Sequence, residues 1–312
     1  MTEIPQLKII FMGTPEFAVE PLEALLKQGY NIIAVITAPD KPAGRGLKVI
    51  ESAVKQAARK HGLKILQPVK FKDEIFLEEL RGLNADLQIV VAFRMLPEVV
   101  WNMPCMGTIN LHASLLPQYR GAAPINWAII NGEKETGVTT FKLKHEIDTG
   151  DILLKDTVSI ADHETAGQLH DKLKTAGSAL LVRTVDGISQ GVLKEYVQPE
   201  EDHASSVLKH APKIFTDTCK IDWSKSIEQI YDLIRGLSPY PAAFTTINGK
   251  TLKIFKAIKE SADIKGQEPE FTTDHKSFLK FTASNGYISI LECQLEGKKR
   301  MGIEEFLRGW RI

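Results

Sequence analysis

The chain has 312 residues, which is enough for two ordinary domains. Hydrophobic residues make up 43% and charged residues 25%, so a disordered or collagen-like chain is excluded. Lys and Arg number 39, as do Asp and Glu, which argues against a strongly basic nucleic-acid binder. The balance is uneven, however: residues 1–208 carry 22 basic and 26 acidic residues, whereas residues 209–312 carry 17 and 13.

The cysteines and the apolar runs indicate the compartment. Cys105, Cys219 and Cys293 are far apart and lack metal-ligand spacing, which is typical of reduced thiols in a cytosolic protein. The longest apolar runs, such as 89–93, fall far short of the ~20 residues of a membrane helix, and the start of the chain lacks signal-peptide features. We therefore expect a soluble cytoplasmic protein without a metal site. No apolar helical repeat demands a partner chain, so a monomer is expected.

The first half predicts an α/β domain. Thr14 is expected to cap a first helix, with Pro15 in its first position and Gly29 at its end. The predicted strands, which are apolar runs, are 7–12, 31–37, 64–66, 87–92 and 108–111. Amphipathic helices are predicted near 51–61 and 72–81. This alternation indicates a Rossmann-like parallel sheet covered on both faces, in which ligands bind beyond the carboxyl ends of the strands.

The second half changes character after a long helix. Strands are predicted at 138–141 and 152–158 and a helix at 164–185, after which residues 187–202 lose periodicity. We expect domains at 1–190 and 209–312, joined by a linker at 191–208. In the second domain a helix is predicted at 227–234, and strands at 244–247, 251–258, 278–282 and 287–292. Asn248-Gly249 is a strong hairpin signal, and the strands suggest a small antiparallel β-barrel of the OB kind.

The densest group of chemically useful residues lies between Gly107 and Pro124. Asn110 and His112 would share one face of a strand, because side chains alternate along a strand. An amide donor and an imidazole at a strand end could stabilise an oxyanion or pass a proton. The alternative is that both side chains merely satisfy hydrogen bonds at the strand end.

Two loops are further candidates. Residues 145–151 gather carboxylates, and Asp148 could accept a proton, although a solvated turn is the alternative and sequence alone cannot place Asp148 beside His112. Residues 37–48 hold the cations Lys41, Arg45 and Lys48 between Pro and Gly, which suits either a phosphate-contacting arm or an ordinary surface loop. Dinucleotide, Walker and nucleophile-elbow motifs are absent from the sequence.

These segments together resemble the folate-dependent formyltransferases. The similarity rests on the run from Asn110 to Pro117, on Arg120-Gly121-Ala122-Ala123-Pro124 and on Asp148-Thr149-Gly150-Asp151. Residues 11–18 and 39–46 are similar to the members that formylate methionyl-tRNA. The similarity covers most of 7–190 and extends more weakly into the basic C-terminal part.

The resemblance implies transfer of a formyl group from 10-formyltetrahydrofolate, as cosubstrate, to the α-amine of methionine on initiator methionyl-tRNA, for translation initiation. It assigns catalysis to Asn110, His112 and Asp148. It assigns tetrahydrofolate binding to the run Ser114, Leu115, Leu116 and Pro117. It assigns tRNA contacts to the loop with Lys41 and Arg45 and to the C-terminal barrel, with no metal.

One segment departs from the family pattern, and one alternative acceptor remains. Residues 92–97, with Arg94, stand where many relatives carry a Tyr-Gly stretch one residue longer, which puts the folate contacts there in doubt. The alternatives that keep the chemistry are formylation of a sugar-nucleotide amine and hydrolysis of formyltetrahydrofolate. The basic second domain and the 37–48 loop favour tRNA, since enzymes acting on small amines need neither. An RNA-binding adaptor without activity is a third reading, and the intact catalytic set argues against it.

Overall fold

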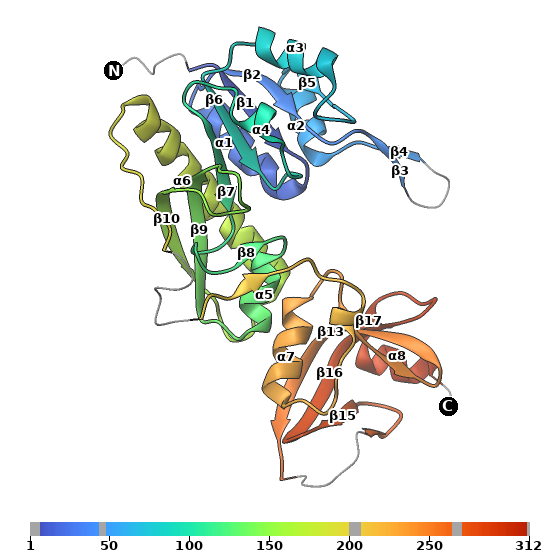
Figure 1. Cartoon of the computed structure of the whole chain (residues 1–312). Coiled ribbons are helices and arrows are strands. Elements are labelled where there is room, and N and C mark those ends of the chain that lie inside the picture. Colours follow the sequence, from blue (N-terminus) through green and yellow to red (C-terminus); the bar gives the residue numbers. More distant parts are fainter. Residues whose placement is uncertain (1–6, 44–47, 200–206, 264–269, 311–312) are drawn as a thin grey trace. The chain divides into compact units, whose positions relative to one another are not determined.

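A computed structural model describes residues 7–43, 48–199, 207–263 and 270–310 (Figure 1). The chain forms two compact units. Unit 1 contains Met1–Arg120, Gly137–Val158 and Asp171–Lys209, and unit 2 contains Gly121–Thr136, Ser159–His170 and His210–Ile312. None of the helices in the described part of the chain is long and apolar enough to cross a membrane.

Unit 1 is built on a seven-stranded sheet with the order β10-β9-β7-β6-β1-β2-β5. Its strands are β1 (Ile9–Gly13), β2 (Ile32–Ile36), β5 (Ile65–Leu66), β6 (Leu87–Val91), β7 (Thr108–His112), β9 (Glu135–Lys142) and β10 (Ile152–Ser159). The five strands from β7 to β5 are parallel, as their continuous apolar runs predict. β9 runs antiparallel to β7, with Thr139 opposite His112 and Lys142 opposite Ile109.

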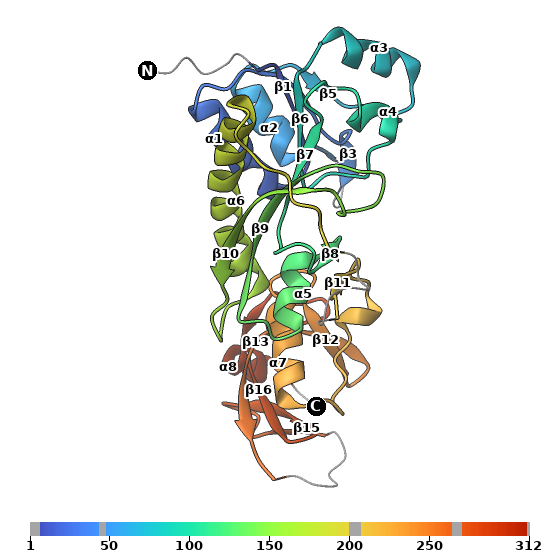
Figure 2. The ribbon, with the colours of Figure 1, turned by 60° about the vertical axis from the view of Figure 1, so that its left-hand side comes forward.

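Helices cover both faces of this sheet. They are α1 (Val19–Lys27), α2 (Ala53–Lys60), α3 (Glu74–Gly82), α4 (Glu98–Trp101) and α6 (Ala166–Ser189). Figure 2 shows α1, α2 and α6 along one face and α3 and α4 along the other. Side chains of α3 and α4 pack on Ile10, Met12 and Val90, while Gly177 of α6 lies against Leu111 on the opposite face. A separate hairpin, β3 (Lys41–Ala43) with β4 (Lys48–Ile50), extends from the unit.

The start of the first helix differs from the prediction. Thr14 is not its cap: a 3-10 turn, η1 (Glu16–Ala18), with Pro15 at its N-cap and no side-chain cap, comes first, and α1 begins at Val19. A Cβ at Gly13 would lie 2.7 Å from Cβ of Ala18. The chain therefore turns back tightly on β1, which needs the narrower 3-10 turn before a regular helix.

Unit 2 holds the basic C-terminal part of the chain. Its main sheet, with the order β12-β13-β16-β15-β14, is antiparallel and confirms the predicted class as a curled, half-barrel sheet. Its strands are β12 (Ala243–Ile247), β13 (Lys250–Ser261), β14 (Phe271–Thr273), β15 (Leu279–Ala283), β16 (Gly286–Leu295) and β17 (Met301–Gly302). Asn248 and Gly249, at φ 48° and 75°, form the predicted hairpin turn.

Short helices accompany this sheet: α7 (Ile227–Gly236) and α8 (Ile303–Gly309) pack on its strands, and α5 (Pro124–Ile130) packs on α7. A 3-10 turn, η3 (Asp217–Cys219), precedes α7. α7 begins with a capping box formed by Ser226 and Gln229, and its Ile230 and Ile234 enter the core against β13 and β16. A two-residue strand β11 (His210–Ala211) pairs with β8 (Arg120–Gly121).

Candidate active site

β7 brings Asn110 and His112 to one face of the sheet at its carboxyl end. Asn110 is the register partner of Val90, so both side chains share the face covered by α3 and α4. His112 is the last residue of β7 and is buried. The Asn110 carboxamide is partly exposed and makes no hydrogen bond to any residue in the described ranges. Its donors are therefore available to a bound molecule at this edge.

The orientation of the His112 ring is fixed by the backbone. Nε2 lies 2.9 Å from the carbonyl oxygen of Tyr119. A carbonyl can only accept, so Nε2 carries a hydrogen and donates it. Nδ1 is then the nitrogen that faces Asp148, whose Oδ2 lies 3.8 Å away. With side chains only 7% and 12% exposed, the imidazole and the carboxylate meet in a largely desolvated place, where electrostatic interactions are strong.

The loop that carries Asp148 connects β9 to β10 and folds back along β7. At its base, the Leu143 amide donates to the carbonyl of Thr108, and the Lys142 amide donates to the carbonyl of Asp151. Asp148 itself adopts φ 56°, a left-handed conformation that non-glycine residues avoid. The structure thus brings together Asn110, His112 and Asp148 in one unit, a step that the sequence left open.

The loop after β7 is held by buried hydrogen bonds. The Thr139 hydroxyl donates to the Ser114 carbonyl at 2.7 Å and accepts from the Leu116 amide at 3.2 Å. Ser114 and Leu116 are buried within the protein, whereas Leu115 and Pro117 are partly exposed. Of the four predicted folate contacts, only the side chains of Leu115 and Pro117 are therefore partly open to solvent. Thr139 was not found by sequence reasoning, because its role depends on the pairing of β9 with β7.

The predicted tRNA-contacting loop is only partly described. Lys41 is exposed on β3, and Arg45 lies outside the described residues. Asp40, at the foot of this hairpin, is anchored by hydrogen bonds from the Lys55 ammonium and the Gln67 amide. These bonds, the one from Lys55 above all, hold the pKa of Asp40 below its usual value. The hairpin therefore starts from a fixed base on α2 and the chain after β5.

Arg94, the departure from the family pattern, is engaged within unit 1. Its guanidinium lies 3.9 Å from the centre of the Phe71 ring and donates to the carbonyls of Pro68 and Val69. Partial burial lowers its pKa. The residue ties its own loop to the segment before α3, which is a stabilising contact.

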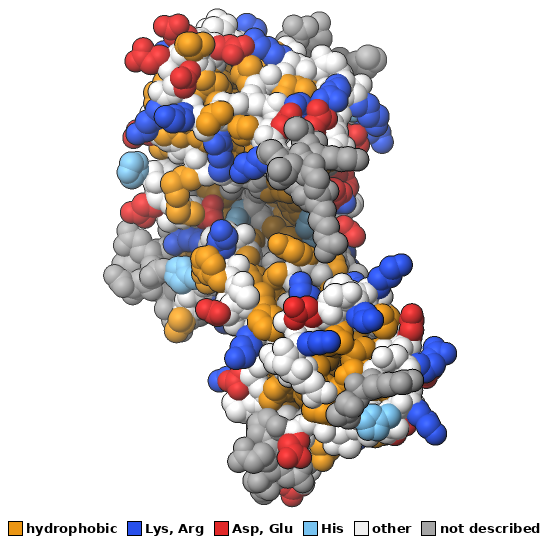
Figure 3. Space-filling view, turned by 90° about the vertical axis from the view of Figure 1, so that its right-hand side faces the viewer, with side chains coloured by type: hydrophobic (Ala, Val, Ile, Leu, Met, Phe, Trp, Pro, Cys, Tyr) orange, Lys and Arg blue, Asp and Glu red, His pale blue; other side chains and the backbone are white. Residues whose placement is uncertain are grey.

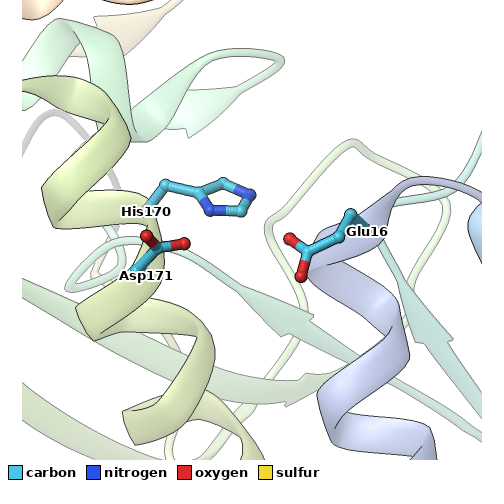
Figure 4. Close-up of side chains that lie close together, drawn as sticks. All are labelled: Glu16, His170 and Asp171. Carbon is cyan, nitrogen blue, oxygen red and sulfur yellow. The ribbon is translucent and has the colours of Figure 1, made fainter.

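The described residues include one group of potential metal ligands, which consists of Glu16, His170 and Asp171 (Figure 4). His170 and Asp171 are consecutive on α6. Lys174 Nζ lies 2.7 Å from Glu16 Oε1 and 3.5 Å from Asp171 Oδ1. A lysine already compensates these carboxylates, and its ammonium would repel a cation. The cluster is thus better explained as an ion-pair network.

Lys and Arg side chains are dispersed over the face of unit 2 that Figure 3 shows. Some lie over aromatic rings, as Lys280 does 4.7 Å from the centre of Tyr287, and others are paired, as Arg300 is with Glu292. Lys280 and Arg300 are thus engaged within unit 2.

Gln198 is the second residue near the site that the sequence did not single out. It lies in the stretch without periodicity after α6, yet it is buried and its amide contacts the loop of Asp148. The only sequence signal was a polar residue in a segment of little regular structure, which predicts a surface linker instead. Two residues earlier, Tyr196 pairs with Ile152 at the start of β10, which holds this segment against that strand.

Comparisons with known proteins agree with this architecture. Residues 7–185 match the formyl transferase family, and residues 213–311 match the formyl transferase C-terminal domain. A methionyl-tRNA formyltransferase from Parabacteroides distasonis is 55% identical over 311 residues, 98% of this chain and 96% of that protein. One from Bacteroides fragilis is 53% identical with the same coverage.

A solved structure supports the fold. The N-formyltransferase from Helicobacter canadensis, in complex with folinic acid and dTDP-3-aminofucose, superposes with a TM-score of 0.68 at 21% identity. The match covers 95% of this chain and all of the other. The family matches span most of the sequence, and the relatives are more than half identical over nearly its whole length. The chain therefore belongs to the formyl transferase family.

Proposed function

We propose that this protein transfers the formyl group of 10-formyltetrahydrofolate to the α-amine of methionine on initiator methionyl-tRNA. The observation that carries the proposal is the fixed His112 ring, with Nδ1 3.8 Å from Asp148 and Asn110 on the same strand face. The relatives that carry the name methionyl-tRNA formyltransferase match nearly the whole chain, which favours this acceptor over a sugar-nucleotide amine. The product, formylmethionyl-tRNA, serves translation initiation.

In the proposed reaction, the methionine amine attacks the formyl carbon and forms a tetrahedral oxyanion. The Asn110 carboxamide and His112, with a proton on Nδ1, donate hydrogen bonds to that oxygen. Asp148 orients His112 and helps remove the proton from the attacking nitrogen, directly or through water. The bond from the carbon to N10 then breaks, and N10 takes up a proton. The enzyme forms no covalent bond.

Folate is proposed to bind along the loop after β7. Leu115 and Pro117 are its partly exposed side chains and would contact the pterin, while the buried Ser114 and Leu116 would hold that surface in place. The hydrogen bonds of Thr139 hold this stretch in place. A pre-formed loop suits a flat, rigid ligand, because little ordering is needed on binding.

The tRNA is proposed to contact the β3–β4 loop and unit 2. Lys41 and Arg45 would meet the acceptor end, and the basic residues after 209 would meet the acceptor arm. Phosphate contacts of this kind weaken with salt. Arg45→Ala is therefore expected to raise the KM for charged tRNA and to leave the KM for the folate unchanged. An unchanged KM for tRNA would refute the role of Arg45.

The decisive experiment measures formyl transfer to charged initiator tRNA, with a nucleotide amino sugar as competing acceptor. Asp148→Asn and His112→Ala should each lower kcat by ~10²- to 10⁴-fold while folate still binds. Glu146→Gln, an exposed carboxylate in the same loop, is the control and should retain full activity. Preferential formylation of the sugar, or near-normal kcat in either variant, would overturn the proposal.

We further infer that the enzyme works in the cytoplasm as a monomer and needs no metal. Lys174 argues against a cation at the Glu16 cluster in particular. Light scattering on a sizing column tests the monomer. Retention of activity in a chelator, after exhaustive dialysis, tests the metal requirement, and loss of activity that zinc or magnesium restores would refute it.

A further inference from the structure

Gln198 connects the loop of Asp148 to Arg120 through a fully used carboxamide. Its Nε2 lies 2.9 Å from the carbonyl oxygen of Asp148 and 2.7 Å from that of Gly150. Its Oε1 lies 3.1 Å from Nε and 2.8 Å from Nη2 of Arg120. Both carbonyls only accept and the guanidinium only donates, so the orientation of this amide is fixed by its partners. The side chain is 5% exposed.

The Gln198 carboxamide binds the backbone of Asp148, the residue whose carboxylate faces His112. Asp148 has φ 56°, in the left-handed region that most non-glycine residues avoid and that Asp adopts more readily in turns, so contacts with its backbone help to hold the loop in this conformation. The two bonds from Gln198 lie on either side of Thr149, at the carbonyls of Asp148 and Gly150. They tie the middle of the β9–β10 connection to a separate segment of the chain, whereas the Lys142–Asp151 bond closes only its base.

Arg120 strengthens this arrangement electrostatically. Two of its N–H groups converge on one amide oxygen, a fork that lysine cannot offer. A cation at the oxygen polarises the carboxamide and makes its N–H groups better donors. The charge of Arg120 thereby acts on the catalytic loop without contacting it.

We propose that Gln198 is a positioning residue of the formyl transfer, which holds the Asp148 carboxylate at Nδ1 of His112 by clamping the loop backbone. The role rests on the proposed function. Gln198 touches no reacting group, so its effect should appear in kcat and leave the KM for folate and tRNA nearly unchanged. A misplacement of about 1 Å in such a site can cost ~10²-fold in rate.

Gln198→Glu is the informative variant, because the carboxylate still accepts from Arg120 but can no longer donate to the two carbonyls. Gln294→Glu is the matched control, since Gln294 also donates from Nε2 to a backbone carbonyl, that of Lys298 in unit 2. For Gln198→Glu we expect kcat to fall by ~10- to 100-fold, with both KM values within twofold. Hydrogen exchange of the amides in 145–151 should accelerate at least tenfold, and Gln294→Glu should change neither.

The outcomes separate the clamp from the reaction. If the wild type is active and Gln198→Glu shows unchanged kcat and unchanged hydrogen exchange in the loop, the clamp alone is refuted. Faster loop exchange with unchanged kcat would overturn its catalytic relevance. An inactive wild type would overturn the proposed function, and with it the role of Gln198, even if exchange still revealed the contact. If Gln198→Glu fails to fold by circular dichroism, Gln198→Met, which lacks all four hydrogen bonds but keeps the length, is judged by the same criteria.

Discussion

Gly150 is the position in the catalytic loop where a single added methyl group is least tolerable. A Cβ at this residue would lie 1.6 Å from the carbonyl oxygen of Lys142 and 2.8 Å from its carbonyl carbon. Both are backbone atoms, so no side-chain rotation can relieve the overlap. Gly150→Ala must therefore separate the loop from the end of β9.

The size of the effect follows from these distances. A Cβ contact of 3.4 Å, the lower end of the ordinary range, requires a shift of about 1.8 Å at a position two residues from Asp148. A 1 Å misplacement of a catalytic group can cost ~10²-fold in rate, so we expect kcat to fall by at least that factor. Insertion of a methyl group into a packed region also costs ~1–3 kcal/mol of unfolding free energy. The KM for charged tRNA should change little, because the proposed tRNA contacts lie elsewhere.

The assay is steady-state formyl transfer to charged tRNA, combined with urea unfolding of the same preparations. Gly82→Ala is the matched control: Gly82 ends α3, has no positive φ, and a Cβ there meets no atom within 4 Å. That variant should keep its kcat and gain ~0.4–1 kcal/mol of stability. A Gly150→Ala enzyme with kcat within twofold of wild type would refute the reasoning, because the loop would then tolerate displacement without loss of catalysis.

Three further outcomes are expected. Thr139→Val removes a buried hydroxyl that donates one hydrogen bond to the loop after β7 and accepts one from it. The substitution should lower the free energy of unfolding in urea by ~1–3 kcal/mol and raise the KM for folate. An unchanged KM for folate would contradict the role given to that loop. Cys219 and Cys293 are buried, which keeps a thiol reagent from reaching them; the same burial raises the pKa of Cys219 and raises that of Cys293 to about 12. The reagent should therefore titrate one group, Cys105, in the native protein and three in denaturant, and fast reaction of more than one native thiol would be the contrary result. Arg94→Met should keep kcat within twofold and lower the free energy of unfolding by ~0.5–2 kcal/mol, because the contact with the Phe71 ring is lost. A large loss of kcat at normal stability would instead place Arg94 in the folate site.

Local patterns predicted the elements well where a single face or turn decides them. The strand predicted at 87–92 is observed at Leu87–Val91, and that at 152–158 at Ile152–Ser159. Asn248 and Gly249 adopt the positive φ values that their hairpin requires. The predicted start of the first helix was wrong, because that start depends on a close approach to β1 that capping preferences do not describe.

The sequence by itself determined the α/β and antiparallel classes and the common face of Asn110 and His112, since both follow from periodicities of the nearby chain. Three things were decided only by the tertiary structure: the meeting of Asp148 with His112, the antiparallel course of β9 and the burial of Gln198. Each joins segments that are tens of residues apart, and such contacts arise from packing and from hydrogen bonds that no local pattern records. In Gln198 the difference is plainest, because its surroundings in sequence are those of a linker and its surroundings in space are those of an active-site loop.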